Sequence, residues 1–359
     1  MKITASVTAA ILCACAGLAQ ELRSAGTLLV DLSAETLAAE DGAFIAQWEN
    51  SGSLGGTFSA LPGNSGAAFT NSLLGRKAVL FGGTAQSTLT NIAAPAALTG
   101  TSAWSMEVWT WVASVPAAKS AYLSWTEDNA ANSWEGSRVM FRYDAGGVAV
   151  DNLNGTVGFG YGTPAAGSWH HIAVVRNTLK QEKVFVDGNT VAFSWCSDPA
   201  QSGIPLSLGA VKKFNSSSYT NFFTGALSRV RIHTGMLSDQ DVLHNYLADA
   251  LSYNAASSAV WTGGTGNWND SANWAEGVVG SSSKAVQLQT GTVNVTNNVA
   301  PGLLKSLDIV GATAALVDAN ARIEAKTPVV VGRAAGSSGT LAVSRGTLAV
   351  NASDRKSVV

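Results

Sequence analysis

Short apolar runs separated by turn residues fill the chain from Gly26 to about Leu251. The runs include Leu28–Val30, Ala78–Phe81, Val139–Phe141 and Ile172–Val175, and they recur roughly every ten residues. Short strands at this spacing, with polar turns between them, are typical of two antiparallel sheets packed face to face. The pattern therefore predicts an all-β sandwich over residues 26–251.

Two local patterns refine this prediction. Residues 105–112 partly alternate, with Met106 and Val108 on one face and Trp109 and Trp111 on the other, so both faces are expected to be covered. At 183–193, two β-branched and aromatic runs flank the pair Asp187-Gly188. This pair supplies the positive φ angles of a tight turn, so the segment predicts a β-hairpin.

One helix is predicted near the end of the sandwich. Ser238 is placed to cap it, with Asp241 three positions later. Val242, Leu243, Tyr246 and Leu247 then form one apolar stripe at helical spacing. Residues 252–259 follow as a linker.

The composition changes at Val260, where tryptophan- and glycine-rich sequence begins. Further on, Gly-Thr pairs at 291, 339 and 346 each precede apolar residues at every second position. Repeated short strands with glycine corners favour a β-solenoid, which we expect over residues 260–353 as the start of a longer array. Residues 354–359 break the pattern and are interpreted as a sequencing artefact, so we expect the natural protein to be longer.

Composition and the amino terminus narrow the class of protein. Charged residues make up 13% of the chain, the formal net charge is −2, and no basic cluster suited to nucleic acid is visible. Residues 1–19 have the short positive start, apolar stretch and small-residue cleavage site of a signal peptide. The apolar stretch is too short for a comfortable membrane span. An alternative is a lipoprotein signal in which Cys15 becomes the lipidated first residue. Either signal would export the chain.

Several longer motifs resemble a known family. They are Gly167–Arg176, Val184–Gly188, Gly225–Ile232 and Met236–Ser238. These segments resemble bacterial laminin-G-like, concanavalin A-like lectin/glucanase domains, and the resemblance implies a concanavalin-like jelly roll over about residues 26–251. The sequence from Trp261, with Val329–Arg333, resembles autotransporter-associated repeats. That second resemblance implies a large exported bacterial surface protein.

Catalytic chemistry is not predicted. Hydrolases that share this sandwich carry two or three carboxylates on one strand face, because a nucleophile and an acid must stand close together. The best-placed strand offers Glu107 alone. His170 and His171 are adjacent and point to opposite faces of a strand, so they cannot bind one metal ion together, while His233 and His244 stand isolated.

Binding is the better-supported chemistry. The flat face of a sugar stacks on an aromatic ring, and Trp134, Tyr143 and Tyr161 lie in or beside polar loops, which makes them the predicted ligand-binding residues. The resemblance also implies that calcium could be held at the rim of the sandwich. Asp128, Asp144 and Asp151 are the candidate ligands for such an ion.

The sequence thus predicts a secreted or cell-surface, non-catalytic adhesion protein that recognises extracellular polysaccharide or surface glycan. One alternative is a structural spacer or accessory module within a larger exported protein. A divergent glycoside hydrolase or polysaccharide lyase is a second alternative, which would require a cleft with two facing carboxylates.

Overall fold

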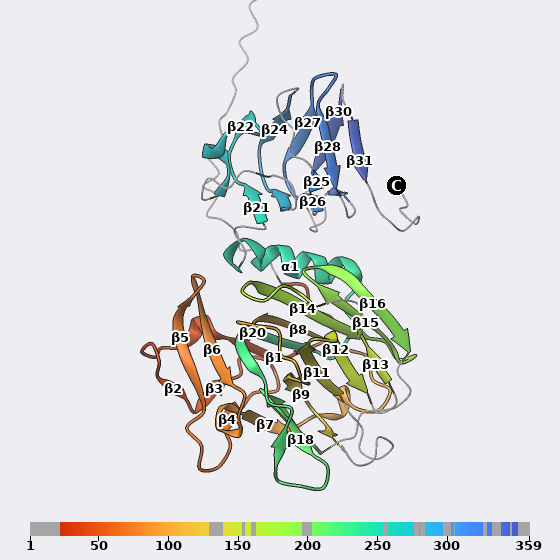
Figure 1. The fold of residues 1–359 in the computed structure, drawn as a ribbon. Coiled ribbons are helices and arrows are strands. Elements are labelled where there is room, and N and C mark those ends of the chain that lie inside the picture. The colour runs from red at the N-terminus through yellow and green to blue at the C-terminus, as the bar shows by residue number, and fades with distance from the viewer. Residues whose placement is uncertain are drawn as a thin grey trace, which may run out of the picture.

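The structure is a computed structural model of the chain (Figure 1). It describes residues 22–128, 139–152, 155–158, 163–195, 203–253, 258–275, 280, 284–296, 303–304, 306–325, 329–331, 339–344 and 347–350. The predicted signal peptide and the last nine residues lie outside these ranges. Among the described residues, no helix is both long and apolar enough to cross a bilayer.

Two large antiparallel sheets form the first part of the fold, as the run pattern predicted. The nine-stranded sheet has the order β16 (Asn189–Trp195), β15 (Gln181–Val186), β14 (Trp169–Arg176), β8 (Trp104–Trp111), β20 (Thr224–His233), β6 (Arg76–Gly82), β5 (Ala67–Leu73), β2 (Phe44–Ile45), and β1 (Leu28–Ser33) also pairs with β20. The eight-stranded sheet has the order β13 (Gly155–Val157), β12 (Gly147–Asn152), β11 (Val139–Asp144), β9 (Ala121–Ser124), β17 (Pro205–Leu208), β7 (Leu89–Ala93), β4 (Thr57–Ala60), β3 (Gln47–Glu49).

Smaller elements complete this part of the chain. A three-stranded sheet consists of β10 (Glu127–Asp128), β18 (Val211–Lys213) and β19 (Tyr219–Thr220). Short 3-10 turns occur at η1 (Ala34–Thr36), η2 (Ala85–Ser87) and η3 (Ala96–Leu98).

The main core lies between the two large sheets and is made of hydrocarbon and aromatic side chains. Trp104 of β8 packs edge-on against Trp125 and Phe141, with ring centroids 5.1 and 5.7 Å away. Met106 and Val108 point into the same core, whereas Trp109 belongs to a second cluster on the outer face. The predicted two-sided burial of this strand is therefore confirmed, and the sheets form a jelly-roll-like sandwich.

The predicted hairpin is present. β15 and β16 pair in antiparallel register and are joined through Asp187 and Gly188, whose φ angles are +50° and +74°. Two successive positive φ values match the twist of the flanking strands, which explains why this sequence turns here.

An α-helix, α1 (Asp239–Tyr253), covers the outer face of the nine-stranded sheet (Figure 1). Ser238 caps it as predicted: the Asp241 amide donates to Ser238 Oγ at 3.1 Å, and the Ser238 amide donates to the Asp241 carboxylate at 3.0 Å. Tyr253 stacks on Trp109 with centroids 4.1 Å apart and an interplanar angle of 6°. The helix is therefore an integral layer of the fold.

The C-terminal residues form three parallel sheets. Their strand orders are β21 (Ser258–Trp261), β23 (Ala285–Leu288), β26 (Ser306–Ile309), β29 (Val329–Val331); β22 (Thr265–Asn267), β24 (Thr292–Val295), β27 (Thr313–Leu316), β30 (Thr340–Val343); and β25 (Leu303–Leu304), β28 (Arg322–Ala325), β31 (Thr347–Val350). Each strand pairs with the one above it in register, so Thr265, Thr292, Thr313 and Thr340 form a single ladder.

The tryptophan-rich segment closes one end of these parallel sheets. Trp261 and Trp268 each meet Trp274 nearly edge-on, at centroid distances of 5.4 and 5.2 Å, and the short turn η4 (Ser271–Asn273) precedes Trp274. The indole N–H of Trp268 donates to the Gly280 carbonyl at 2.8 Å. The cluster thus covers the apolar interior, and the indole N–H groups of Trp268 and Trp274 both donate to backbone carbonyls.

Substituting Gly188 tests the packing of the hairpin against α1. A Cβ at Gly188 would lie 2.7 Å from Leu243 and 2.9 Å from Tyr246, in addition to the cost of a positive φ. We expect Gly188→Ala to lower the free energy of unfolding by about 3 kcal/mol, as overpacking and backbone strain combine. The control is Gly75→Ala, where φ is +80° but nothing lies within 4 Å of the added Cβ, and roughly 1 kcal/mol is expected. The two free energies of unfolding would be measured by urea titration. Equal decreases for the two variants would show that α1 does not pack tightly against the turn at Gly188.

Candidate functional site

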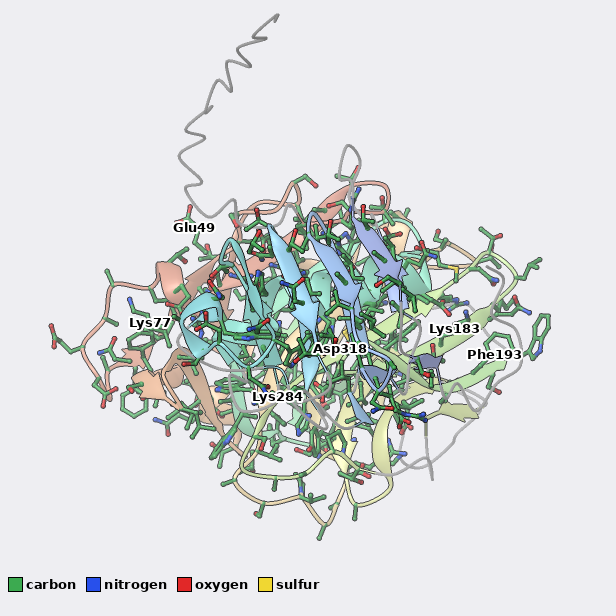
Figure 2. The ribbon with its side chains drawn as sticks, turned by 90° about the horizontal axis from the view of Figure 1, so that it is seen from above. Glu49, Lys77, Lys183, Phe193, Lys284 and Asp318 are labelled. Atoms are coloured by element: carbon green, nitrogen blue, oxygen red, sulfur yellow. The ribbon has the colours of Figure 1, made fainter. Side chains whose placement is uncertain are left out.

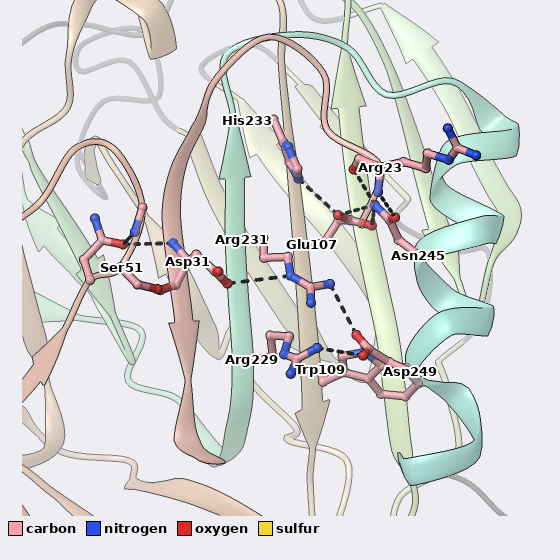
Figure 3. Close-up of polar contacts among 12 residues, drawn as sticks. Arg23, Asp31, Ser51, Glu107, Trp109, Arg229, Arg231, His233, Asn245 and Asp249 are labelled. Carbon is pink, nitrogen blue, oxygen red and sulfur yellow. Dashed lines mark hydrogen bonds and ion pairs between the residues drawn. The ribbon is translucent and has the colours of Figure 1, made fainter. Parts of the chain in front are cut away.

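The outer face beneath α1 holds a buried carboxylate, Glu107 of β8 (Figure 3). His233 Nε2 lies 3.1 Å from Oε2 and His171 Nε2 lies 3.4 Å from Oε1. The Asn245 amide of α1 donates to both carboxylate oxygens, at 3.1 and 2.9 Å. We call these four residues the Glu107 cluster.

Hydrogen bonding keeps this carboxylate charged. Burial alone would raise the pKa of Glu107, but the close approach of His171, the hydrogen bond with His233 and the positive charge of Arg231 outweigh burial and lower the pKa from 4.5 to about 2. A carboxylate with so low a pKa is a poor proton donor at neutral pH. The prediction that His233 stands isolated was wrong, because β20 brings it beside Glu107.

Asp249, one helical turn after Asn245, makes a second set of polar contacts that hold α1 on the sheet. Asp249 accepts from Arg229 at 2.6 Å, from Arg231 at 3.3 Å and from the indole N–H of Trp109 at 3.3 Å (Figure 3). Asn245 and Asp249 are four residues apart, so they share one face of α1. The centre of this sheet face is therefore closed by the helix, and its charged groups have partners within the fold.

The edge of the same sheet is open and aromatic. Phe193 and Trp195 of β16 are 49% and 63% exposed. They are two residues apart on a strand, so their side chains project from the same face. An indole exposed to this extent is unusual, because Trp is among the most buried residue types on average. We call these two residues the aromatic pair.

A row of polar side chains runs beside the aromatic pair. On the neighbouring strand β15, Lys183 is the register partner of Phe193 and Gln181 is the partner of Trp195. Cross-strand partners point to the same side of a sheet. Lys183 Nζ also donates to Asp239 at the start of α1, at 2.7 Å, which places the row on the helix-covered face. Figure 2 shows Lys183 and Phe193 together at one side of the molecule.

The predicted ligand-binding residues fall in different places. Tyr143 is fully buried and its hydroxyl donates to the Pro164 carbonyl at 2.6 Å. Its ring packs in the core between the sheets, so it presents no face to a sugar. Trp134 and Tyr161 lie outside the described residues.

The predicted calcium ligands Asp144 and Asp151 are paired with cations of the chain itself. Both carboxylates contact Arg142, with Asp151 accepting from Arg142 Nε at 2.9 Å, and Asp151 also accepts from Lys119 Nζ at 2.7 Å. Asp128 lies in β10, and its side chain is outside the described part of the chain. The described residues contain no group of three or more His, Cys, Asp or Glu side chains suited to a metal ion.

The comparison with protein families concerns the larger part of the sandwich. Residues 81–243 match the family model described as the concanavalin A-like lectin/glucanases superfamily. These residues form a concanavalin A-like domain. No curated protein matches the sequence.

Solved structures resemble this chain only distantly. The botulinum neurotoxin serotype G binding domain matches with 12% identity and a TM-score of 0.45, over 61% of this chain and 50% of that one. Domain 4 of the arabinanase AbnA from Geobacillus stearothermophilus, in complex with arabinotriose, matches with 16% identity and a TM-score of 0.37, over 62% of this chain and 100% of that one. A sialidase CBM40 of Ruminococcus gnavus, bound to sialyllactose, matches with 16% identity and a TM-score of 0.33, over 40% and 80%. This chain spans about half the length of the neurotoxin binding domain.

Sequence reasoning missed the aromatic pair of the concanavalin A-like domain. The only available signal was the alternation Phe193-Ser194-Trp195 directly after the predicted hairpin. Alternation places the two rings on one face, but it does not say whether that face is covered. That information comes from the exposed fractions of the two side chains on the end strand of the described sheet.

Replacing the buried acid tests the Glu107 cluster. We expect Glu107→Gln to lower the free energy of unfolding at pH 7 by roughly 3 kcal/mol, since it removes one partner of a buried charged network. The exposed Glu49→Gln serves as control and should have little effect. Because the folded pKa of Glu107 lies below its ordinary value, its contribution is present above about pH 4.5 and is lost as the pH falls towards 2. Urea titrations should therefore show that the difference in free energy of unfolding between wild type and Glu107→Gln becomes smaller as the pH falls over that range. A constant gap would contradict this assignment.

Calcium should not stabilise the concanavalin A-like domain through Asp144 and Asp151. Their carboxylates already bind Arg142, so a metal ion would have to displace a guanidinium. We expect the Tm to change by less than about 1 °C between millimolar calcium and EDTA, since only a ligand that binds the folded state raises stability. A rise in Tm with calcium that Asp151→Asn abolishes would show that these residues do bind the ion.

Proposed function

We propose that this chain is an exported, non-catalytic protein whose concanavalin A-like domain binds carbohydrate on the aromatic pair. The observation that carries the proposal is the exposure of Phe193 and Trp195 on one face of an edge strand. The flat apolar face of a sugar ring stacks on such rings, and nearby amide and ammonium groups bind its hydroxyls. Gln181 and Lys183 provide those groups on β15.

The positions of the described carboxylates support a binding role without catalysis. Hydrolysis of a glycosidic bond needs two carboxyl groups facing one substrate. Glu107 is buried under α1 among His171, His233 and Asn245. Asp144 and Asp151 are both engaged by Arg142. The sequence also predicts export, through the signal peptide at residues 1–19.

We further propose that the C-terminal parallel sheets are the beginning of a β-solenoid stalk of the autotransporter-associated type. Three features support this interpretation: strands that stack in parallel register, an interior filled by Val, Leu, Ile and Ala, and a tryptophan cluster at one end. Stacked rungs of this kind bury a continuous apolar core. The stalk would display the binding domain at a bacterial surface, in keeping with a role in adhesion.

Truncating the aromatic pair tests carbohydrate binding. Full-length protein would be run in affinity electrophoresis through gels containing xylan, hydroxyethylcellulose or laminarin. We expect retardation in at least one gel, and Trp195→Ala and Phe193→Ala should each weaken it about tenfold, the equivalent of one lost stacking contact. Both side chains are exposed, so the folding of these variants should be unaffected.

Phe44→Ala is the matched control. Phe44 is 58% exposed and lies on β2, at the opposite edge of the same sheet. Its removal should leave retardation unchanged. Retardation neither in these three gels nor in a gel containing the uronic acid polymer alginate would contradict the proposed function, and loss of equal size in all three variants would show non-specific apolar adsorption.

A further inference from the structure

We infer that the ligand is an uncharged linear polysaccharide that lies along β16. This inference rests on the proposed function and specifies the class of its ligand. It comes from the geometry of two parallel rows, the aromatic pair on β16 and the polar side chains of Gln181 and Lys183 on β15.

The spacing of the aromatic pair favours a chain over a single sugar. Side chains two residues apart on a strand are separated by roughly 6.6 Å along it, which is comparable to the length of one sugar unit. A monosaccharide would stack on one ring only. A chain running along the strand would cover Trp195 and Phe193 with neighbouring units and bury both exposed rings.

The polar row runs in the same direction as the aromatic row. Cross-strand partners lie about 5 Å apart, so a sugar stacked on Trp195 would have one edge beside Gln181, and the unit on Phe193 would have the same edge beside Lys183. On the opposite side, β16 is the end strand of the described sheet, and the edge of a sheet offers backbone N–H and C=O groups. The hydroxyls of a chain in this position would find polar groups along both of its edges.

The charge balance beside the aromatic pair favours an uncharged ligand. Lys183 forms an ion pair with Asp239 at 2.7 Å. The row therefore offers a hydrogen-bond donor whose charge is already compensated within the protein. Binding of an uncharged chain should depend little on salt, because no net charge is neutralised.

Chain length and salt together test the inference. The full-length protein would be titrated calorimetrically with the polymer that retards it and with its one- to four-unit oligosaccharides. We expect affinity to rise at least about tenfold from monosaccharide to tetrasaccharide. The rise should be lost in Trp195→Ala and in Phe193→Ala but kept in Phe44→Ala. Affinity for the polymer should change less than about twofold between 50 and 500 mM NaCl.

Other outcomes separate this inference from the proposed function. If the monosaccharide binds as tightly as the tetrasaccharide and Trp195→Ala abolishes both, the site stands but the linear-chain inference fails. Binding confined to uronic acid polymers and lost in high salt would overturn the uncharged class. Sedimentation showing a dimer that Trp195→Ala dissociates would identify a second copy of the chain as the occupant of the edge, against both proposals.

Discussion

The docking of α1 on the nine-stranded sheet is the constraint on which the remaining structure depends. Tyr253 lies flat on Trp109 at 4.1 Å, and Asp249 and Asn245, four and eight residues earlier on α1, place polar groups against the same sheet. The sheet could not leave Glu107 in an apolar layer without hydrogen-bond partners, since an isolated buried charge is strongly destabilising. The helix supplies Asn245, and β14 and β20 supply the two histidines. Packing and electrostatics thus require the same arrangement.

This arrangement determines which parts of the outer face of the nine-stranded sheet are available for binding. A helix over the centre of a sheet removes that face from solvent and leaves only its margins. On the margin at β16 the chain places Phe193 and Trp195, and on the opposite margin at β2 it places Phe44. The two margins differ in one respect that bears on function. Only β16 carries two rings in a row with amide and ammonium groups beside them, and a sugar needs both kinds of contact.

Local patterns predicted the elements well because each depends on neighbouring residues. The turn at Asp187-Gly188, the cap at Ser238 and the two-sided burial of β8 all follow from spacing within a few positions. Contacts between distant segments could not be predicted in this way. Glu107 and His233 are far apart in sequence and meet only because β8 and β20 are neighbours in the sheet. Tyr143 likewise looked like a loop-edge aromatic, yet its strand turns it into the core.

The exposure of the aromatic pair on an end strand favours unwanted association with other chains, and this favours the presence of a ligand that covers it. An end strand offers unpaired backbone groups to any other strand, and natural proteins commonly protect such edges with charge. Here the edge instead presents Phe193 and Trp195, and Lys183 on the neighbouring strand forms an ion pair with Asp239. Apolar rings on the end strand of the described sheet favour association with another chain unless something else covers them. A polysaccharide chain would cover both the rings and the polar edge at once, which makes the edge strand a binding surface and relieves the tendency to associate.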